Sequence, residues 1–378
     1  MIEIDGSFGE GGGQVLRTSL TLAALTGQAT HIHSIRAGRR NPGLAPQHLT
    51  GVLALASVCG AVVEGATIGS TEVIFRPTSP PVAGTYDFDV TDAAQGGSAG
   101  SVTLIFQTLL LPLWAAAGES RVTLRGGTHV AWSPPYHYLE RVFLPTVARM
   151  GIHAEIALEG WGFYPVGGGA VRALVGHQSP VIGRQSSDDH SPFAIRTLRL
   201  VERGALKRVS GIAAATKLPA NIPQRIANRA TNYLQDNGVK ADVQPLRERG
   251  AGPGVGLFLT AEFENGVAGF SSLGEKGKPS ERVAEEACLD FLAFRGHADA
   301  AVDMRLADQL LLPLALADGV SEFTTCRVTQ HLLTNAHIIR QFIDARIEIA
   351  GEEGAPGHVT VHGVSFTAES AKDAESRQ

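Results

Sequence analysis

The chain has 378 residues, of which 44% are hydrophobic and 18% are charged, and its formal net charge is −5. This composition is typical of a folded globular protein with more than one core, and it excludes a largely disordered chain. The small negative charge provides no broad basic surface, so any contact with a polynucleotide must be local.

Compartment and membrane association are read from the cysteines and from the apolar segments. Cys59, Cys288 and Cys326 are far apart and odd in number, which predicts buried free thiols in a reducing compartment rather than disulfides or a paired-cysteine metal site. The chain starts with a strand-like segment, and its longest apolar run, residues 102–117, is short for a membrane span. We therefore expect a cytoplasmic protein without membrane contact.

The first 78 residues read as one α/β unit. Alternating or continuous apolar segments predict its strands and helices, and glycine, proline and arginine mark the turns between them. In chain order we expect a strand at 1–4, a helix at 14–25, a strand at 30–35, a helix at 46–59 and strands at 61–64 and 72–76.

The next hundred residues repeat this order. We expect a strand at 84–90, a helix at 101–116, a strand at 120–125, a helix at 138–150 and strands at 153–158 and 170–175. The recurrence predicts tandem copies of one α/β module.

A linker rich in Ser, Asp, Gly and Pro follows at 176–192, and it predicts a domain boundary. The strands expected at 195–203, 240–246 and 256–262 and the helix at 219–236 predict a small inserted domain. Helices at 280–294 and 300–317, strands at 322–327 and 345–349 and a helix at 334–343 then resume the larger pattern. The expected division is a large catalytic domain at 1–184, an inserted α/β domain at 185–279, the large domain again at 280–366 and a polar tail at 367–378.

Two segments predict anion binding. Residues 9–17, GEGGGQVLR, place Glu10 and Arg17 beside a glycine backbone that can approach a ligand closely, at the expected start of a helix. The stretch lacks the Lys-Ser/Thr ending of a Walker loop. Residues 34–49 add several arginines and His48 in a turn-rich segment, which indicates a second anion-binding surface.

The HExxH motif of zinc hydrolases does not occur in the sequence, and we consider histidine as the candidate nucleophile. His331 lies between a predicted strand and a helix whose N-cap we place at Thr334. A neutral imidazole at a helix start can attack phosphorus while the helix end stabilises the phosphate charge. A histidine that only closes a turn fits the same position, and both interpretations stay open at this point.

Polar residues inside apolar helices need partners, which either a ligand or the core can supply. Gln107 and the pair Asp308 and Gln309 are such residues. Their positions alone do not decide between the two.

Eight ordered motifs resemble the RNA 3′-terminal phosphate cyclase family over residues 2–349. They are GEGGGQVLR, SIRAGRRNPGLAPQHL, GSAGSVTLIFQ, GGTHVAWSPPY, GFYPVGGG, LGEKGKP, LADQLLLP and HLLTN. The resemblance implies an α/β (α+β) fold with three repeats of a module like the C-terminal domain of translation initiation factor three. It also implies a smaller α/β domain inserted before the last repeat.

The resemblance implies a reaction in three steps. A histidine attacks the α-phosphorus of ATP, which forms a covalent histidine-AMP and releases diphosphate. AMP then passes to an RNA 3′-terminal phosphate, and the 2′-hydroxyl attacks that phosphate to give a 2′,3′-cyclic phosphate and AMP. A divalent metal, Mg or Mn, would neutralise the triphosphate. The expected partner is RNA with a 3′-terminal phosphate, and the oligomeric state is left open.

The resemblance assigns roles to residues of this chain. His331 matches the nucleophile and Glu10 matches the metal ligand. Nucleotide binding falls to Gln107 and to the run Arg305, Leu306, Ala307, Asp308 and Gln309, and binding of the RNA phosphate falls to Arg17, Arg36, Arg39, Gln47 and His48. Arg305 stands where some members carry an aromatic residue, although arginine also stacks on bases. The segment 90–97 is longer than in compact members.

Two alternatives remain beside this interpretation. A catalytically silent relative that acts in ribosome assembly would lack the nucleophilic histidine, so His331 argues against it. An enolpyruvyl transferase shares the repeated module but would not be expected to carry HLLTN.

Overall fold

The first repeat is a four-stranded sheet covered by two helices. The structure, a computed structural model, describes residues 1–93, 98–176 and 194–366, so the expected tail lies outside it, as do most of the expected linker and part of the longer loop at 90–97. The strands lie in the order β1-β2-β4-β3, with only β1 and β2 parallel. The elements are β1 (Ile2–Asp5), α1 (Gly13–Thr26), β2 (Thr30–His33), α2 (Pro46–Cys59), β3 (Val62–Glu64) and β4 (Val73–Arg76).

The second repeat has the same topology, with strand order β5-β6-β8-β7 and only β5 and β6 parallel. The helix expected at 138–150 forms as three joined segments, because a π-turn interrupts the α-helical pattern. The elements are β5 (Thr85–Asp89), α3 (Val102–Ala115), β6 (Ser120–Gly126), α4 (Tyr136–Tyr138), η1 (Leu139–Phe143), α5 (Leu144–Ala148), β7 (Ala154–Gly160) and β8 (Gly169–Val175).

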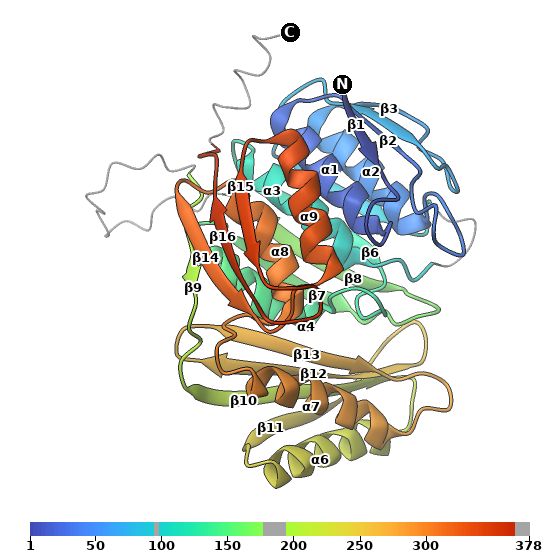
Figure 1. Ribbon diagram of the computed structural model, residues 1–378. Coiled ribbons are helices and arrows are strands. Elements are labelled where there is room, and N and C mark those ends of the chain that lie inside the picture. Colours follow the sequence, from blue (N-terminus) through green and yellow to red (C-terminus); the bar gives the residue numbers. More distant parts are fainter. Residues whose placement is uncertain (94–97, 177–193, 367–378) are drawn as a thin grey trace.

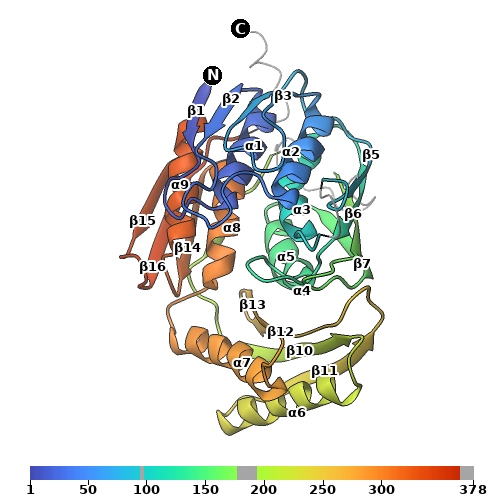
Figure 2. The ribbon, with the colours of Figure 1, turned by 90° about the vertical axis from the view of Figure 1, so that its right-hand side faces the viewer.

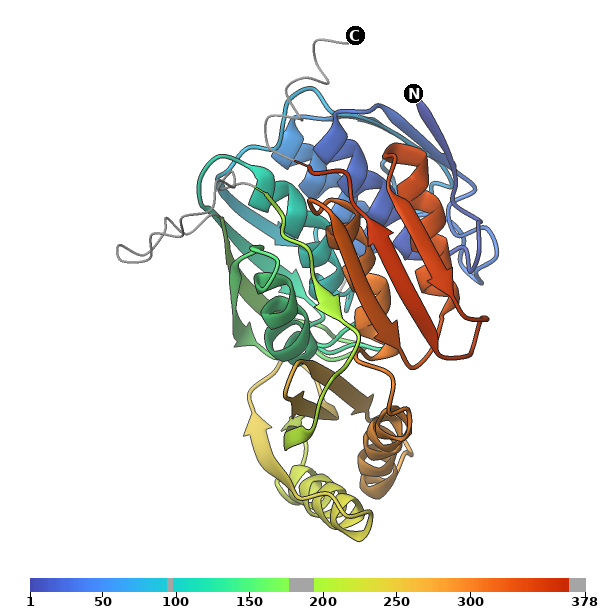
Figure 3. The same cartoon turned by 60° about the vertical axis from the view of Figure 1, so that its left-hand side comes forward.

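The third repeat completes the pattern with strand order β9-β14-β16-β15. Its two parallel strands are β9 and β14, which lie side by side (Figure 3). Arg199 of β9 is opposite Glu322 of β14. The three identical strand orders confirm the predicted α/β fold of three repeats. The elements are β9 (Arg199–Leu200), α8 (Met304–Ala315), β14 (Val320–Thr325), α9 (Gln330–Phe342), β15 (Arg346–Ala350) and β16 (Gly357–His362).

A smaller unit is inserted into the third repeat. Its sheet has the order β11-β10-β12-β13, and its two helices cover the face that points away from the three repeats (Figures 1 and 2). The elements are β10 (Leu206–Thr216), α6 (Asn221–Asp236), β11 (Ala241–Glu248), β12 (Gly254–Phe263), β13 (Val267–Leu273) and α7 (Ser280–Gly296). The sequence prediction missed β10 and β13, whose Ala, Gly and Ser residues have low strand propensity.

Packing corrects both expected limits of the insertion. The strand expected at 195–203 as part of the inserted domain contributes β9, which pairs with β14 of the third repeat. Helix α7 was expected to resume the large domain, but Phe291 packs on Phe270 of β13 in the smaller core. The insertion therefore lies between β9 and α8, and the limits at 185 and 279 do not match this packing.

The larger core lies where helices of the three repeats meet between their sheets. Helix α1 packs against α9 and α3, and α8 packs against α9, so helices from different repeats share one apolar interior. The three cysteines are free, as expected, but only Cys59 and Cys288 are buried, whereas Cys326 is half-buried. No helix in the described ranges has both the length and the hydropathy of a membrane span.

An aromatic cluster joins the second repeat to the insertion and encloses two histidines. Nε2 of His129 lies 3.0 Å from Nδ1 of His137, and the His129 ring stacks on Trp161 at 4.4 Å between centroids. Phe258 of β12 contacts both imidazoles from the insertion side. Burial lowers the pKa of His137 to about 3, with a smaller effect from Arg141, and burial also lowers the pKa of His129. Both rings are therefore neutral in the folded protein at pH 7.

This pair predicts loss of stability in acid. A histidine whose pKa is lowered by folding binds fewer protons in the folded state, so its contribution holds above about pH 6.5 and declines as the pH falls toward 3. Between pH 7 and pH 5, the free energy of unfolding of His137→Gln should fall by about 2 kcal/mol less than that of the wild type, as measured by urea unfolding. The exposed His297 supplies the control variant His297→Gln, and a pH slope for His137→Gln equal to that of the wild type would contradict the prediction.

Candidate active site

The glycine turn between β1 and α1 lies directly against the start of α9. Gly9 has a φ of 63°, and a Cβ at this position would lie 2.2 Å from Oγ1 of Thr334. Any other residue would therefore clash and adopt a strained backbone. This contact brings the N-terminal ends of α1 and α9 together, next to candidate site residues that the sequence analysis named.

Three predicted site residues meet at this contact. Nδ1 of His331 lies 3.5 Å from Oε1 of Glu10, and Nη2 of Arg39 lies 3.4 Å from Oε2 of the same carboxylate. The three side chains are 39–43% exposed, so a ligand from solvent can reach them.

Helix α9 begins earlier than expected. Its first residue is Gln330 and its N-cap is Thr329, whose hydroxyl accepts a hydrogen bond from the Leu332 N–H at 3.1 Å. Thr334 is therefore no N-cap but a buried residue inside the helix. His331 consequently lies in the first turn, where unpaired N–H groups favour an anion beside the imidazole.

Electrostatics keeps His331 uncharged. Burial lowers its pKa, Glu10 acts in the opposite direction, and Arg17 and Arg39 lower the pKa further. A neutral imidazole retains one nitrogen lone pair at neutral pH, which nucleophilic attack requires.

Three of the predicted phosphate-binding residues, Arg17, Gln47 and His48, line one recess between α1, α2 and α3. Nδ1 of His48 accepts a hydrogen bond from the Ala45 N–H at 3.1 Å, and burial with the nearby Arg36 and Arg17 lowers the His48 pKa to about 3. The ring is thus neutral, and its proton is on Nε2. A Cβ at Gly13 would lie 2.4 Å from Nε2, so this glycine makes room for the ring.

Arg36 differs from the other predicted phosphate ligands. Its guanidinium donates a 2.7 Å hydrogen bond to the Gly43 carbonyl, and its own φ is 55°. The side chain therefore stabilises its own loop, although its positive charge stays close enough to Arg39 for that arginine to lower the Arg36 pKa, second to burial.

Asp308 and Arg17 are half-buried residues of opposite charge type that influence each other without a direct contact. Burial raises the pKa of Asp308 to about 7, and Arg17 counteracts this rise. Burial lowers the pKa of Arg17 to about 10, while Asp308 acts to raise it. Oδ1 of Asp308 is buried without a hydrogen-bond partner among the described residues. Such an atom fits a ligand hydroxyl that would donate a hydrogen bond to it.

The remaining predicted nucleotide residues divide into two groups. Gln107 and Gln309 contact each other, with Nε2 of Gln107 2.6 Å from Oε1 of Gln309. Leu306 and Ala307 instead face the apolar core, where their side chains cannot reach a ligand. Nη2 of Arg305 lies 3.5 Å from Oδ2 of Asp290 of α7, and the Arg305 carbonyl accepts from the side-chain amide of Gln309 at 2.8 Å.

Sequence reasoning missed two residues that connect these helices. The side-chain amide of Asn335 donates to the Asp308 carbonyl at 3.1 Å and accepts from the Thr18 hydroxyl at 3.0 Å. Asn335 thus joins α1, α8 and α9 one turn after His331. Asp303 caps α8 and accepts from the Tyr138 hydroxyl at 2.8 Å and from the Gly269 N–H at 3.2 Å. A polar residue one helical turn from His331 was the available signal for Asn335.

A resident metal centre is not supported by the side chains present. In residues 1–93, 98–176 and 194–366, no group of three or more His, Cys, Asp or Glu side chains could hold a metal ion. Glu10 alone fits a Mg²⁺ or Mn²⁺ ion that arrives with a nucleotide, because Mg²⁺ commonly binds one or two carboxylates together with phosphate oxygens.

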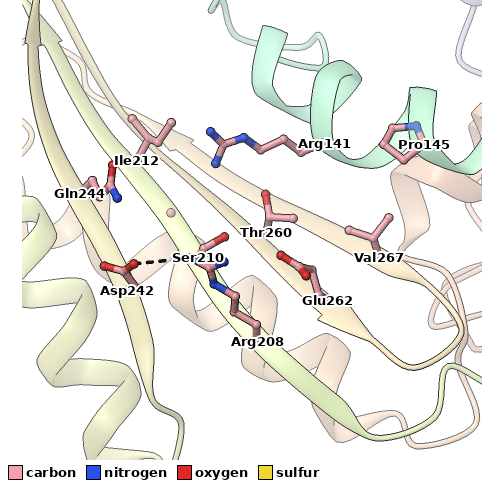
Figure 4. A pocket seen from close by; sticks show the side chains of 11 residues that line it. Arg141, Pro145, Arg208, Ser210, Ile212, Asp242, Gln244, Thr260, Glu262 and Val267 are labelled. Carbon is pink, nitrogen blue, oxygen red and sulfur yellow. Dashed lines mark ion pairs between the residues drawn. The ribbon is translucent and has the colours of Figure 1, made fainter.

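A second groove of ≈ 540 Å³ lies between η1 and α5 of the second repeat and the sheet of the insertion (Figure 4). Arg141 and Pro145 form one wall, and residues of β10, β11 and β12 form the other. Arg208 lies 3.6 Å from Asp242, and Arg141 pairs with Glu140 at 3.2 Å. Its cations are thus paired with acids, and none of the predicted site residues lines it.

Comparison with known proteins agrees with the motifs. A family model described as RNA 3′-terminal phosphate cyclase matches residues 8–349. The chain belongs to this family. It is 52% identical to an RNA 3′-terminal phosphate cyclase of Trichormus variabilis over 90% of this chain and 94% of that protein, and 49% identical to one of Gloeothece citriformis over 95% and 99%.

More distant matches extend this picture. A relative of the same name from Archaeoglobus fulgidus is 40% identical over 93% of this chain and 99% of its own length. Among solved structures, the enolpyruvyl transferase NikO from Streptomyces tendae is 11% identical with a TM-score of 0.38, over 98% of this chain and 49% of that one. This low score carries no argument about function.

The role of Asn335 leads to a testable prediction. Asn335→Ala removes two hydrogen bonds between helices, so it should lower the free energy of unfolding by about 1–3 kcal/mol in urea titrations. Gln341 lies on the same helix, is exposed and bonds only to His337 within the described residues, which makes Gln341→Ala the control. Equal stability of the two variants would show that Asn335 does not join the helices.

Proposed function

We propose that the protein converts an RNA 3′-terminal phosphate to a 2′,3′-cyclic phosphodiester, with ATP, through a histidine-AMP intermediate on His331. The observation that carries the proposal is the accessible, neutral His331 beside Glu10, at the meeting point of the N-terminal ends of α1 and α9. Membership of the cyclase family supports the same substrate. The three free cysteines fit a cytoplasmic location.

His331 performs the first step in this proposal. Nδ1 faces the Glu10 carboxylate, which favours the tautomer with its proton on Nδ1 and leaves the Nε2 lone pair to attack the α-phosphorus. The phosphorus–nitrogen bond forms as the bond to diphosphate breaks. The helix N-terminus stabilises the charge on the phosphate oxygens. Glu10 would also hold the divalent ion that accompanies ATP, whose chemistry is to neutralise the triphosphate.

The nucleotide would then lie along α8. Gln107 and Gln309 offer amide groups for the base, and Oδ1 of Asp308 lacks a partner among the described residues and can accept from a ribose hydroxyl. A carboxyl group whose pKa is near 7 is ionised in part of the molecules at neutral pH. The positive charge of Arg17 would favour its ionised form.

The RNA phosphate would occupy the surface formed by the cations Arg17 and Arg39 and the neutral imidazole of His48. A phosphate monoester suits forked guanidinium donors and the Nε2–H of a neutral imidazole. An RNA phosphate oxygen attacks the phosphorus of histidine-AMP and returns the electron pair to Nε2. The adjacent 2′-hydroxyl then attacks the RNA phosphorus and releases AMP.

Labelling with ATP tests the nucleophile. Incubation with α-labelled ATP and Mg²⁺ or Mn²⁺ should leave an acid-labile, base-stable label on the protein, and His331→Ala should abolish it. His337→Ala, on the same helix, is the control and should retain the label. An unlabelled wild-type protein would exclude the histidine-AMP mechanism. If the protein is labelled but fails to cyclise a 3′-phosphorylated oligonucleotide, the assignment of His331 as nucleophile stands and the proposed RNA substrate is excluded.

A second experiment separates the two substrates. Because we assign Arg39 to the RNA phosphate, Arg39→Ala should lower kcat/KM for cyclisation by about 10- to 150-fold, which corresponds to a hydrogen bond with a charged group. Self-adenylylation should fall less. Arg39→Lys, which keeps the charge without the fork, should give an intermediate loss of cyclisation. Equal losses of both activities in Arg39→Ala would contradict the assignment.

A further inference from the structure

Two large aromatic side chains are exposed on neighbouring loops beside the candidate site. Trp132 is 100% exposed and Tyr164 is 75% exposed. Both loops begin at the backbone bridge between His129 and Phe163. Trp132 lies three residues after His129, and Tyr164 directly follows Phe163. The two aromatic residues are therefore at most about 20 Å apart along the backbone, which is the span of a few nucleotides.

These loops are held in place, so the exposure is built into the fold. The Thr128 N–H donates to the Gly162 carbonyl at 2.9 Å, and the Thr103 hydroxyl donates to the Pro134 carbonyl at 2.7 Å. Trp132 itself has a φ of 64°, which is a strained conformation for a bulky residue. Backbone strain at a fully exposed tryptophan indicates a functional rather than a packing role.

The aromatic loops are continuous with the candidate active site. The Ser101 N–H, at the N-cap of α3, donates to Oε1 of Gln47 at 2.8 Å. Ser101 also forms a backbone bridge with Gly127 at the start of the first loop. Thr103, which holds Pro134, lies one helical turn before Gln107 on the same face of α3. An RNA strand that leaves the phosphate-binding recess can thus continue over these two loops.

Two exposed cations of the insertion lie at the far side of the loops. Lys217 donates from Nζ to the Ala251 carbonyl at 2.5 Å, and Ala251 lies against Gly168 of the second loop. Arg249 directly precedes Gly250, which bridges Trp161. In the part of the chain that the structure describes, neither cation forms an ion pair with an acidic side chain.

We propose that Trp132 and Tyr164, with Lys217 and Arg249, form a binding surface for the nucleotides that precede the RNA 3′ end. The bases stack on the two aromatic rings, and the backbone phosphates face the two cations. The proposal rests on the proposed function for the position of the RNA 3′ end. It also assigns the insertion a task, which is to supply cations to the strand that leaves the active site.

Tryptophan fluorescence tests this surface on the intact chain. Trp114 is 2% exposed and Trp161 is 9% exposed, so quenching by a ligand reports mainly on Trp132. An RNA hexanucleotide should quench the emission whether it ends in a 3′-phosphate or a 3′-hydroxyl, whereas ATP alone should not. Trp132→Phe should abolish the quenching. Quenching by ATP and not by RNA would place Trp132 in the nucleotide site and overturn the proposal.

Affinity measurements complete the test. Trp132→Ala should weaken binding of the hexanucleotide by about 5- to 150-fold, the range for one stacked base, and weaken binding of a mononucleoside 3′-phosphate less. Lys217→Ala should reduce the slope of log affinity against log salt by about 0.7. Lys207→Ala, at the opposite end of β10, is the matched control and should keep the slope. Equal losses for both RNA lengths, or equal slopes for both lysine variants, would overturn the proposal.

The tests of this RNA-binding surface can fail or succeed independently of the tests of the proposed function. Binding and quenching by the 3′-hydroxyl hexanucleotide need neither the nucleophile nor ATP. Quenching without labelling of His331 would retain this surface and remove the cyclase mechanism. Labelling and cyclisation without quenching would retain the cyclase mechanism and exclude this binding surface.

Discussion

The close approach of Gly9 to Thr334 is the contact on which the candidate site depends. It joins a turn near one end of the chain to a helix more than 300 residues later, and only a residue without a side chain permits it. Glu10 follows Gly9 and His331 lies one turn before Thr334 along α9, so the contact between the Gly9 backbone and the Thr334 side chain holds Glu10 and His331 close together. Their pairing is therefore a property of helix packing between repeats rather than of any local motif.

The fold was predictable to the extent that it is local and repeated. The β1–α1–β2–α2 order recurs in the sequence as apolar segments separated by glycine-rich turns, and the structure has the same order. The limits of the insertion were not predictable in this way. The two-residue strand β9 is assigned to the third repeat only by its pairing with β14. The apolar residues of α7 indicate a buried face but not which of the two cores it packs against. Both depend on partners distant in sequence, which periodicity does not report.

The candidate site was predictable where residue type limits chemistry. Glu10 and Arg39 were selected in turn-rich segments that contain glycine, and His331 was selected before a predicted helix. The structure brings these three residues together. Leu306 and Ala307 came only with their motif, and they lie in the core. Asn335 was missed because a connecting role becomes visible only when the packing of three helices is known. The catalytic roles of all these residues stay predictions.

The position of the insertion also affects the order in which the protein can form during synthesis. Arg199 and Glu322, opposite each other in β9 and β14, are 123 residues apart in the chain. The first two repeats can pair their strands as they leave the ribosome, whereas β9 must wait until the whole insertion has emerged. Helix α9 comes later still. A nascent chain therefore acquires the proposed nucleophile, His331, after the residues that we propose to bind the substrates have emerged.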